Sequence, residues 1–94
     1  MLDTVKPVAK RYEYDRMTGE QLSAALAQLG ITMREFAKLT GSKPERVQAW
    51  LLGNDNIPQS AALAAVLLTL PGALELARTY TDSVSRDTRT PQRD

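Results

Sequence analysis

Residues 43–48, with the sequence KPERVQ, gather side chains that form strong hydrogen bonds with a charged or polar partner. Lys43 and Arg46 are cationic donors, Glu45 is an anionic acceptor, and the amide of Gln48 both donates and accepts. Groups of this kind recognise phosphates and base edges, or the polar surface of another protein. The elements around this segment must therefore hold it outward in a fixed conformation.

Catalytic and metal-binding chemistry has little support in the composition. The 94 residues include no cysteine and no histidine, which excludes disulfides, cysteine nucleophiles, histidine-based triads and the commonest zinc sites. The remaining carboxylates, lysines and tyrosines are scattered, without a glycine-rich phosphate loop or a metal-ligand spacing. We therefore expect no enzyme activity, no metal and no cofactor.

Size and charge indicate one small domain without a strong electrostatic bias. Hydrophobic residues make up 43% of the chain and charged residues 24%, and 12 basic against 11 acidic residues give a net charge of +1. A non-specific nucleic-acid binder would be strongly basic, so a charge-driven partner must meet a local patch. The longest apolar run, residues 61–70, is too short to span a bilayer, and the N-terminus is unlike a signal peptide. We expect a cytoplasmic protein.

Three helix start signals follow one another between residues 18 and 53. Each is a capping box, in which Ser or Thr accepts a hydrogen bond from a backbone N–H three residues on and Glu or Gln reaches back. Each precedes apolar residues at helical spacing and a closing glycine. The boxes are TGEQ (Thr18, Gln21), TMRE (Thr32, Glu35) and SKPE (Ser42, Glu45), and the glycines are Gly30, Gly41 and Gly53.

Two further helices complete an all-α fold. One is predicted from Pro58 to about Leu70 and the next from Ala73 to about Tyr80, separated by the LPG break. Ala73, Leu76, Ala77 and Tyr80 would share the apolar face of the last helix. Residues 1–16 are expected to form a flexible arm, 17–80 a compact five-helix domain, and 81–94 a disordered tail.

Residues 32–53 predict a helix, a tight turn containing glycine, and a second helix, which is the helix-turn-helix arrangement. Ala37 is small enough for the two helices to approach, and Gly41 permits the backbone conformation of the turn. Val47 and Trp50 would fill the space between this pair and the first helix. The side chains from Lys43 to Ala49 that remain outward would face a DNA major groove.

The segment LGITMREFAKLTGSKPERVQAWLLGNDNIP, residues 29–58, resembles the lambda-repressor and Cro-like family, also called the XRE family. The surrounding helices are consistent with this resemblance over about residues 17–80. The family implies a compact five-helix domain whose third helix reads base edges, usually as a dimer on a palindromic operator. Ser42 and Leu51 depart from its pattern, which often has an apolar and an acidic residue there. A capping role for Ser42 would account for the first departure.

Each proposed DNA contact also has a plainer interpretation. Lys43 could meet a phosphate or a guanine edge, and Gln48 could pair with adenine, or either could be an ordinary surface residue. Glu45 could accept from a cytosine amino group, although we favour its capping role. Trp50 is expected in the core. The candidate DNA-binding residues are Thr32, Arg34, Ser42, Lys43, Glu45, Arg46, Gln48, Ala49, Asn54 and Asn56.

The predicted fourth helix is apolar on nearly every side, so a small domain can bury only part of it. The exposed remainder predicts a homodimer interface, with Leu63, Leu67, Leu70 and Leu74 as candidates. The alternative is that the fifth helix and the N-terminal arm cover this surface. Lys6, Lys10 and Arg11 of the arm could instead reach along DNA.

Two functions are compatible with this pattern, and a third, an enzyme, has the least support. The first is a sequence-specific transcriptional regulator, expected to be a repressor, that binds an inverted-repeat operator in double-stranded DNA as a dimer. The alternative is a protein-binding module with this fold that does not read DNA, such as an antiactivator or a partner of a toxin or polymerase. The near balance of charges over residues 30–58 favours the alternative.

Overall fold

The computed structural model describes residues 12–86, and within them the chain forms five helices and no strand. This result confirms the predicted all-α fold. The predicted arm up to residue 11 and the tail from residue 87 lie outside the described residues. The helices are α1 (Gly19–Leu29), α2 (Met33–Thr40), α3 (Pro44–Leu52), α4 (Gln59–Leu67) and α5 (Ala73–Val84).

Helices α1 and α2 begin where their capping residues predict. The Thr18 hydroxyl accepts from the Gln21 backbone N–H at 3.0 Å, and the Gln21 side chain accepts from the Thr18 N–H at 2.9 Å. Thr32 likewise accepts from the Glu35 N–H at 3.1 Å. The Glu35 carboxylate does not complete this second box, because it is engaged by Arg78 of α5.

The turn between α2 and α3 is fixed by glycine and by local hydrogen bonds. Gly41 has φ of 72°, the left-handed conformation that side chains with a Cβ rarely adopt. This conformation lets the Ser42 N–H donate to the Ala37 carbonyl at 2.9 Å and close the end of α2. The Thr40 hydroxyl also donates to the Phe36 carbonyl at 2.8 Å. The direction in which α3 leaves α2 is therefore set locally.

The predicted cap of α3 is wrong by one residue. Lys43, not Ser42, is the N-cap, and no side chain caps this helix. Glu45 is consequently the second helical residue, and the capping role favoured for it does not form. The Ser42 hydroxyl lies instead 3.1 Å from that of Thr40. Pro44 takes the first helical position, where its missing N–H would have had no intrahelical partner.

The core joins one large side chain from each of the first three helices. Leu22 of α1, Phe36 of α2 and Val47 of α3 are fully buried, and Trp50 of α3 is 2% exposed. Burial of side chains of this size stabilises by about 1.5–3 kcal/mol each. The predicted core role of Trp50 is confirmed. The other buried residues are Leu26, Ile31, Ala37, Ile57, Ala61, Ala65 and Leu68.

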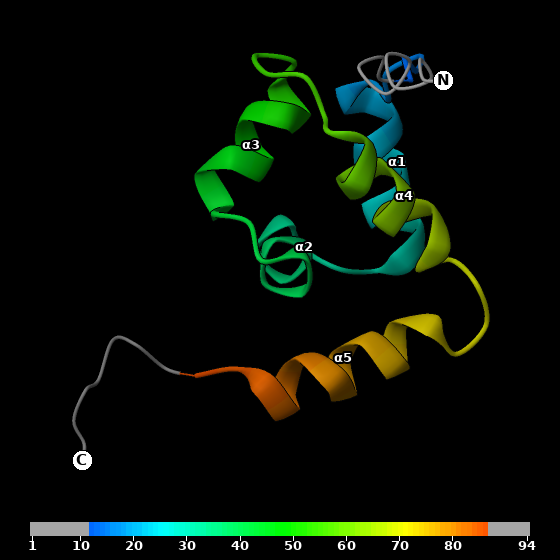
Figure 1. Cartoon of the computed structure of the whole chain (residues 1–94), viewed down its shortest axis with the longest axis vertical. Helices are drawn as coiled ribbons and strands as arrows, with labels where there is room; N and C mark the ends of the chain where they lie inside the picture. Colours follow the sequence, from blue (N-terminus) through cyan, green and yellow to red (C-terminus); the bar gives the residue numbers. More distant parts are fainter. Residues whose placement is uncertain (1–11, 87–94) are drawn as a thin grey trace, which may run out of the picture.

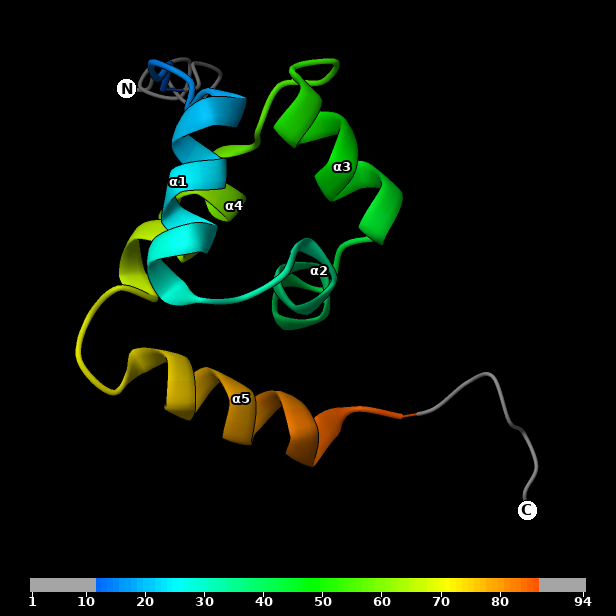
Figure 2. The same cartoon turned by 180° about the vertical axis from the view of Figure 1, so that it is seen from behind.

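Helix α2 lies between α3 and α5, whereas α1 contacts α3 and α4 (Figures 1 and 2). Helix α3 is therefore held by α1 and α2, and both of its ends are joined to the core by short segments. No helix in residues 12–86 is long and apolar enough to cross a membrane.

Helix α4 is shorter than predicted and only half buried. It ends at Leu67 instead of about Leu70, with Ala61 and Ala65 facing the core. A row of larger side chains faces solvent on the opposite side, as predicted from the apolar character of the whole helix. We call this row the α4 stripe; its residues and exposed fractions are Leu63 (48%), Val66 (55%), Leu67 (48%) and, just beyond the helix, Leu70 (56%).

Helix α5 differs from its prediction in both length and orientation. It continues to Val84, so residues 81–84, assigned to the disordered tail, are helical. The side chains packed against the core are Leu74 and Ala77, whereas Leu76 and Tyr80 of the predicted apolar face are 71% and 65% exposed. Leu74 therefore stabilises the domain itself, and it does not belong to the exposed surface predicted for a dimer.

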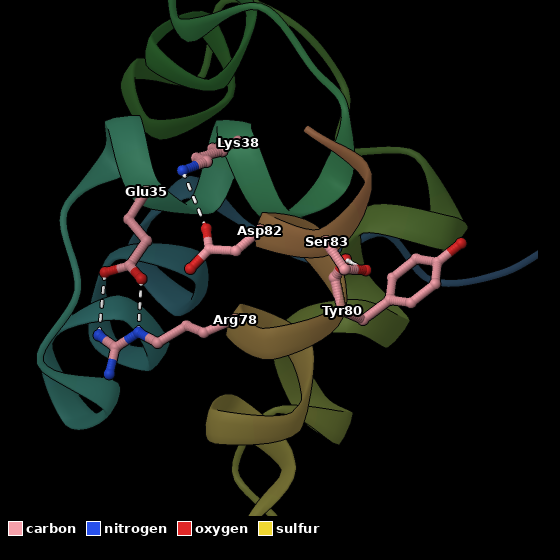
Figure 3. A network of polar contacts seen from close by, with 6 residues as sticks. All are labelled: Glu35, Lys38, Arg78, Tyr80, Asp82 and Ser83. Atoms are coloured by element: carbon pink, nitrogen blue, oxygen red, sulfur yellow. Dashed lines mark hydrogen bonds and ion pairs between the residues drawn. The ribbon is translucent and has the colours of Figure 1, made fainter. Parts of the chain in front are cut away.

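Two ion pairs attach α5 to α2 (Figure 3). They supplement weak packing, because no residue of α5 is fully buried. The Arg78 guanidinium donates two hydrogen bonds to the Glu35 carboxylate, from Nε to Oε2 at 2.6 Å and from Nη2 to Oε1 at 3.0 Å. Lys38 Nζ lies 3.3 Å from Asp82 Oδ1. The hydrogen bond from Arg78 lowers the pKa of Glu35, and the same bond raises the pKa of Arg78.

We predict that Gly19→Ala destabilises the protein. A glycine in a helix is normally improved by alanine, because alanine loses less conformational entropy on folding. At Gly19, however, a Cβ would lie 2.5 Å from the Leu51 carbonyl oxygen and 2.7 Å from that of Trp50. We expect a cost of about 1–3 kcal/mol from this overpacking, measured by urea unfolding with far-UV circular dichroism. The control Ser23→Ala, on the exposed side of α1, should be neutral or stabilising; a stabilising Gly19→Ala would contradict the close approach of α1 and α3.

We predict that the Glu35–Arg78 pair makes stability depend on pH in the acid range. Because the folded-state pKa of Glu35 is lowered, its contribution is present above the ordinary glutamate pKa and is lost as pH falls through the folded value. Glu35→Gln should therefore cost about 0.5 kcal/mol near neutral pH, as exposed pairs do, and less near about pH 3. Urea unfolding of both proteins at the two pH values measures the difference. Glu13→Gln, before α1, should show no such convergence.

Candidate nucleic-acid interface

The outer face of α3 carries a row of side chains that the described residues leave open to solvent. Glu45, Gln48, Ala49 and Leu52 follow one another at helical spacing, opposite the buried Val47. Glu45, Gln48 and Leu52 are exposed, and Ala49 is half buried. The candidates Glu45, Gln48 and Ala49 thus share one surface, which can meet a partner without displacing any core residue.

Lys43 and Arg46 lie on the flank of this face and line a groove between α3 and α4. Both side chains are exposed, and Ser42 lies beside them on the same groove. Lys43 and Arg46 are three residues apart across the first turn of α3, so their charges act on the same region. The structure therefore brings Ser42, Lys43 and Arg46 together, although Ser42 does not play the predicted capping role.

Thr32 and Arg34 lie at the beginning of α2. Thr32 is the N-cap and uses its hydroxyl on the Glu35 N–H, so its side chain already has a structural role. Arg34, the second residue of the helix, is exposed. The N-terminal end of a helix favours anions through its free N–H groups and dipole, and a cation there adds to that attraction.

Asn54 and Asn56 follow the C-terminal end of α3, at the opposite end of the helix from Lys43. The Asn54 backbone N–H donates to the Ala49 carbonyl at 2.9 Å and closes α3. Both side chains are exposed. Their position suits residues that shape the turn after α3, and a nine-residue helix of about 13 Å separates them from the first turn of α3.

The charges around α2 and α3 are divided between paired and accessible groups. Two charged side chains of α2, the anionic Glu35 and the cationic Lys38, are paired with side chains of α5. Among the ion pairs between described residues, none involves Arg34, Lys43 or Arg46. Lys43 and Arg46 flank the α3 face on the side of α4, while Glu45 places a negative charge on the face itself. The α3 face is thus cationic along one edge and carries one carboxylate, so its net charge is small.

Sequence reasoning missed three features of this region. Leu52 is 66% exposed at the end of the α3 face. The sequence pattern did not predict a leucine on this outward surface. Ser60 of α4 and the side of Trp50 line the same groove as Lys43. The spacing of Leu52 from Val47 could have shown that it points away from the core, whereas the meeting of α3 and α4 depends on tertiary packing.

The described residues hold no cluster of three or more aspartate, glutamate, histidine or cysteine side chains that could bind a metal ion. No protein-family model, no curated protein and no solved structure matches this chain. The arrangement of α2, α3 and their accessible side chains is therefore the basis on which a function can be proposed.

Proposed function

We propose that the protein is a sequence-specific DNA-binding regulator that reads an operator with the outer face of α3. The observation that carries this proposal is the orientation of α3, whose buried Val47 and Trp50 leave Gln48 and its neighbours outward. A helix fixed by one face can enter a major groove with the other. Gln48 has the donor and acceptor needed for an adenine edge. Arg34, Lys43 and Arg46 would neutralise phosphates beside it.

We further propose that two copies bind an inverted repeat, as expected of a repressor. The accessible cations around α3 are few, so one domain would hold DNA weakly. Two domains with α3 about one helical turn of DNA apart would add their contacts. The α4 stripe supports this assembly, because its half-exposed side chains lie in residues 56–74, which contain no charged residue. Asp15 and Arg16 lie beside Leu63 and Val66, but their opposite charges leave this edge without a net repulsion, so the stripe can meet a copy of itself.

One observation favours a second function, the protein-binding module. The α3 face carries Glu45, which phosphates would repel, and the 66% exposed Leu52, which a DNA groove would not require. A protein partner could bury this leucine within a rim of polar groups, which is how protein interfaces are organised. In this alternative the same face would contact one protein partner, and no cofactor or membrane would be involved.

We predict that substitutions separate phosphate contacts from base contacts. On an operator selected from a random duplex library, Gln48→Ala should cost about 1–3 kcal/mol, with little effect on a scrambled duplex. Arg34→Ala should weaken binding to both duplexes alike and lower the slope of log K against log salt by about 1, because it removes one phosphate contact. Fluorescence anisotropy over a salt series measures both effects.

The matched control is Arg86→Ala, which removes the same charge from an exposed residue beyond α5. It should leave the specific affinity nearly unchanged. The regulator proposal would be abandoned if no duplex were selected or bound at low salt while Gln48→Ala or Lys43→Glu released a single protein partner in pull-downs. That pair of results would support the protein-binding module.

We predict that charge placed on the α4 stripe gives a folded monomer. Leu70→Glu or Leu63→Glu should dissociate the dimer in sedimentation velocity and weaken operator binding, because a buried carboxylate without a partner is costly. Val84→Glu, at an exposed apolar residue at the C-terminal end of α5, away from the stripe, should leave the dimer intact. A wild-type protein that sediments as a monomer at high concentration would remove the premise. Circular dichroism confirms that each variant is folded.

A further inference from the structure

The groove between α3 and α4 has the size of a small-molecule site. Its volume is about 520 Å³, within the range of roughly 300–1,000 Å³ typical of ligand pockets. It lies between the first turns of α3 and the first turns of α4, next to the turn that joins α2 to α3. Its lining combines residues from four consecutive parts of the chain, the end of α2, the turn, α3 and α4.

The apolar part of the groove is formed by Leu39, Trp50, Ala61 and Ala64. Trp50 and Ala61 belong to the buried core, and Leu39 packs against it, so this wall is held in place by the fold itself. The alanines leave room where larger side chains would fill the groove. Leu39 and Ala64 are the half-buried members of this wall, so a flat or compact apolar group could rest against them and exclude water.

The polar part of the groove is cationic. Lys43 and Arg46 project from one side of α3, and the hydroxyls of Ser42 and Ser60 line the groove with them. No carboxylate is among the described residues that line it. The contrast with Lys38 and Arg78 is informative, because α5 and α2 supply carboxylates to those two cations whereas no described carboxylate pairs with Lys43 or Arg46.

The start of α4 adds to this cationic character. Pro58, at its N-cap, lines the groove and offers no side-chain cap to the first turn. The N–H groups of the first turn and the dipole of the helix favour a negative charge at this end. This contribution supports the two side chains, whose positions on the groove define the binding chemistry.

We propose that this groove binds a small organic anion, a carboxylate or phosphate monoester that carries one ring or a short branched chain. The anionic group is held by Lys43 and Arg46. The apolar body lies against Leu39 and Ala64, next to the edge of the buried Trp50. If the proposed function is correct, the ligand also regulates it, because Lys43 and Arg46 cannot neutralise the ligand and DNA phosphates at once. The bound anion then weakens operator binding.

The test separates the charge from the apolar body with four probes in amide NMR titrations of the whole chain, without DNA. Phenylacetate and phenyl phosphate represent the two anionic groups, phenylacetamide lacks the charge, and inorganic phosphate lacks the body. We expect at least one of the two anions to shift the Trp50 indole signal and the amides of residues 42–46 and 60–64 saturably. Phenylacetamide and inorganic phosphate should bind at least about fivefold more weakly, since each keeps only half of the interaction.

Charge variants locate the site. Lys43→Gln and Arg46→Gln should each lower the affinity for the anion about fivefold, as expected for the loss of one partly exposed charge contact. Arg86→Gln removes the same charge outside the groove and should change the affinity little. The NMR spectrum of each variant reports whether it is folded.

Three results would overturn the proposal: no saturable shift with either anion, equal binding of phenylacetamide, or equal weakening by Arg86→Gln and Lys43→Gln. Shifts confined to Leu67, Leu76 and Tyr80 would also overturn it, because they would place the probe in the separate groove between α4 and α5. A final anisotropy experiment adds the bound anion to the protein–operator complex. Absence of operator binding would remove the proposed function but leave the NMR result standing, so the two failures are distinguishable.

Discussion

The burial of Val47 and Trp50 is the interaction on which the rest of the structure depends. These two side chains fix one face of α3 against α1 and α2, and they thereby decide which side chains of a nine-residue helix remain outward. Gly19 makes this packing possible, because the beginning of α1 reaches the last carbonyls of α3 at a distance that a Cβ would prevent. A side chain at position 19 would move the whole α3 face, although that residue is remote from it in sequence.

The two C-terminal helices are attached by weaker means, and this difference assigns them different roles. Helix α4 contributes small side chains to the core and keeps its large ones outside, which leaves the α4 stripe exposed for the proposed association. Helix α5 has no fully buried residue and is held by Leu74, Ala77 and two ion pairs with α2. Exposed pairs of this kind stabilise by less than about 1 kcal/mol each. The first three helices therefore carry most of the stability.

The sequence predicts what is decided within a few residues and misses what depends on distant packing. The starts of α1 and α2 and the glycines that close the first three helices follow from local hydrogen bonds, and all were predicted correctly. Ser42 was misassigned because it also matches a capping motif, and only the observed turn shows that Lys43 is the N-cap of α3. The orientation of α5 could not be predicted, since Glu35 and Arg78 are separated by 43 residues. The residues of the candidate site were proposed from the sequence and stay a prediction, whereas the groove beside them requires the placement of α4 against α3.

The distribution of charge explains why one surface could serve both DNA and a small ligand. Cations engaged by carboxylates, such as Arg78 and Lys38, hold the helices together and contribute little attraction to a partner. Arg34, Lys43 and Arg46 remain accessible, and two of them line the groove next to the α3 face. With so few accessible cations, the loss of two to a bound anion would remove most of the phosphate attraction available to one domain. Because the net charge of the protein is near zero, the proposed DNA binding is weak in a single domain and depends on association through α4. For the same reason it is sensitive to any anion that occupies the groove.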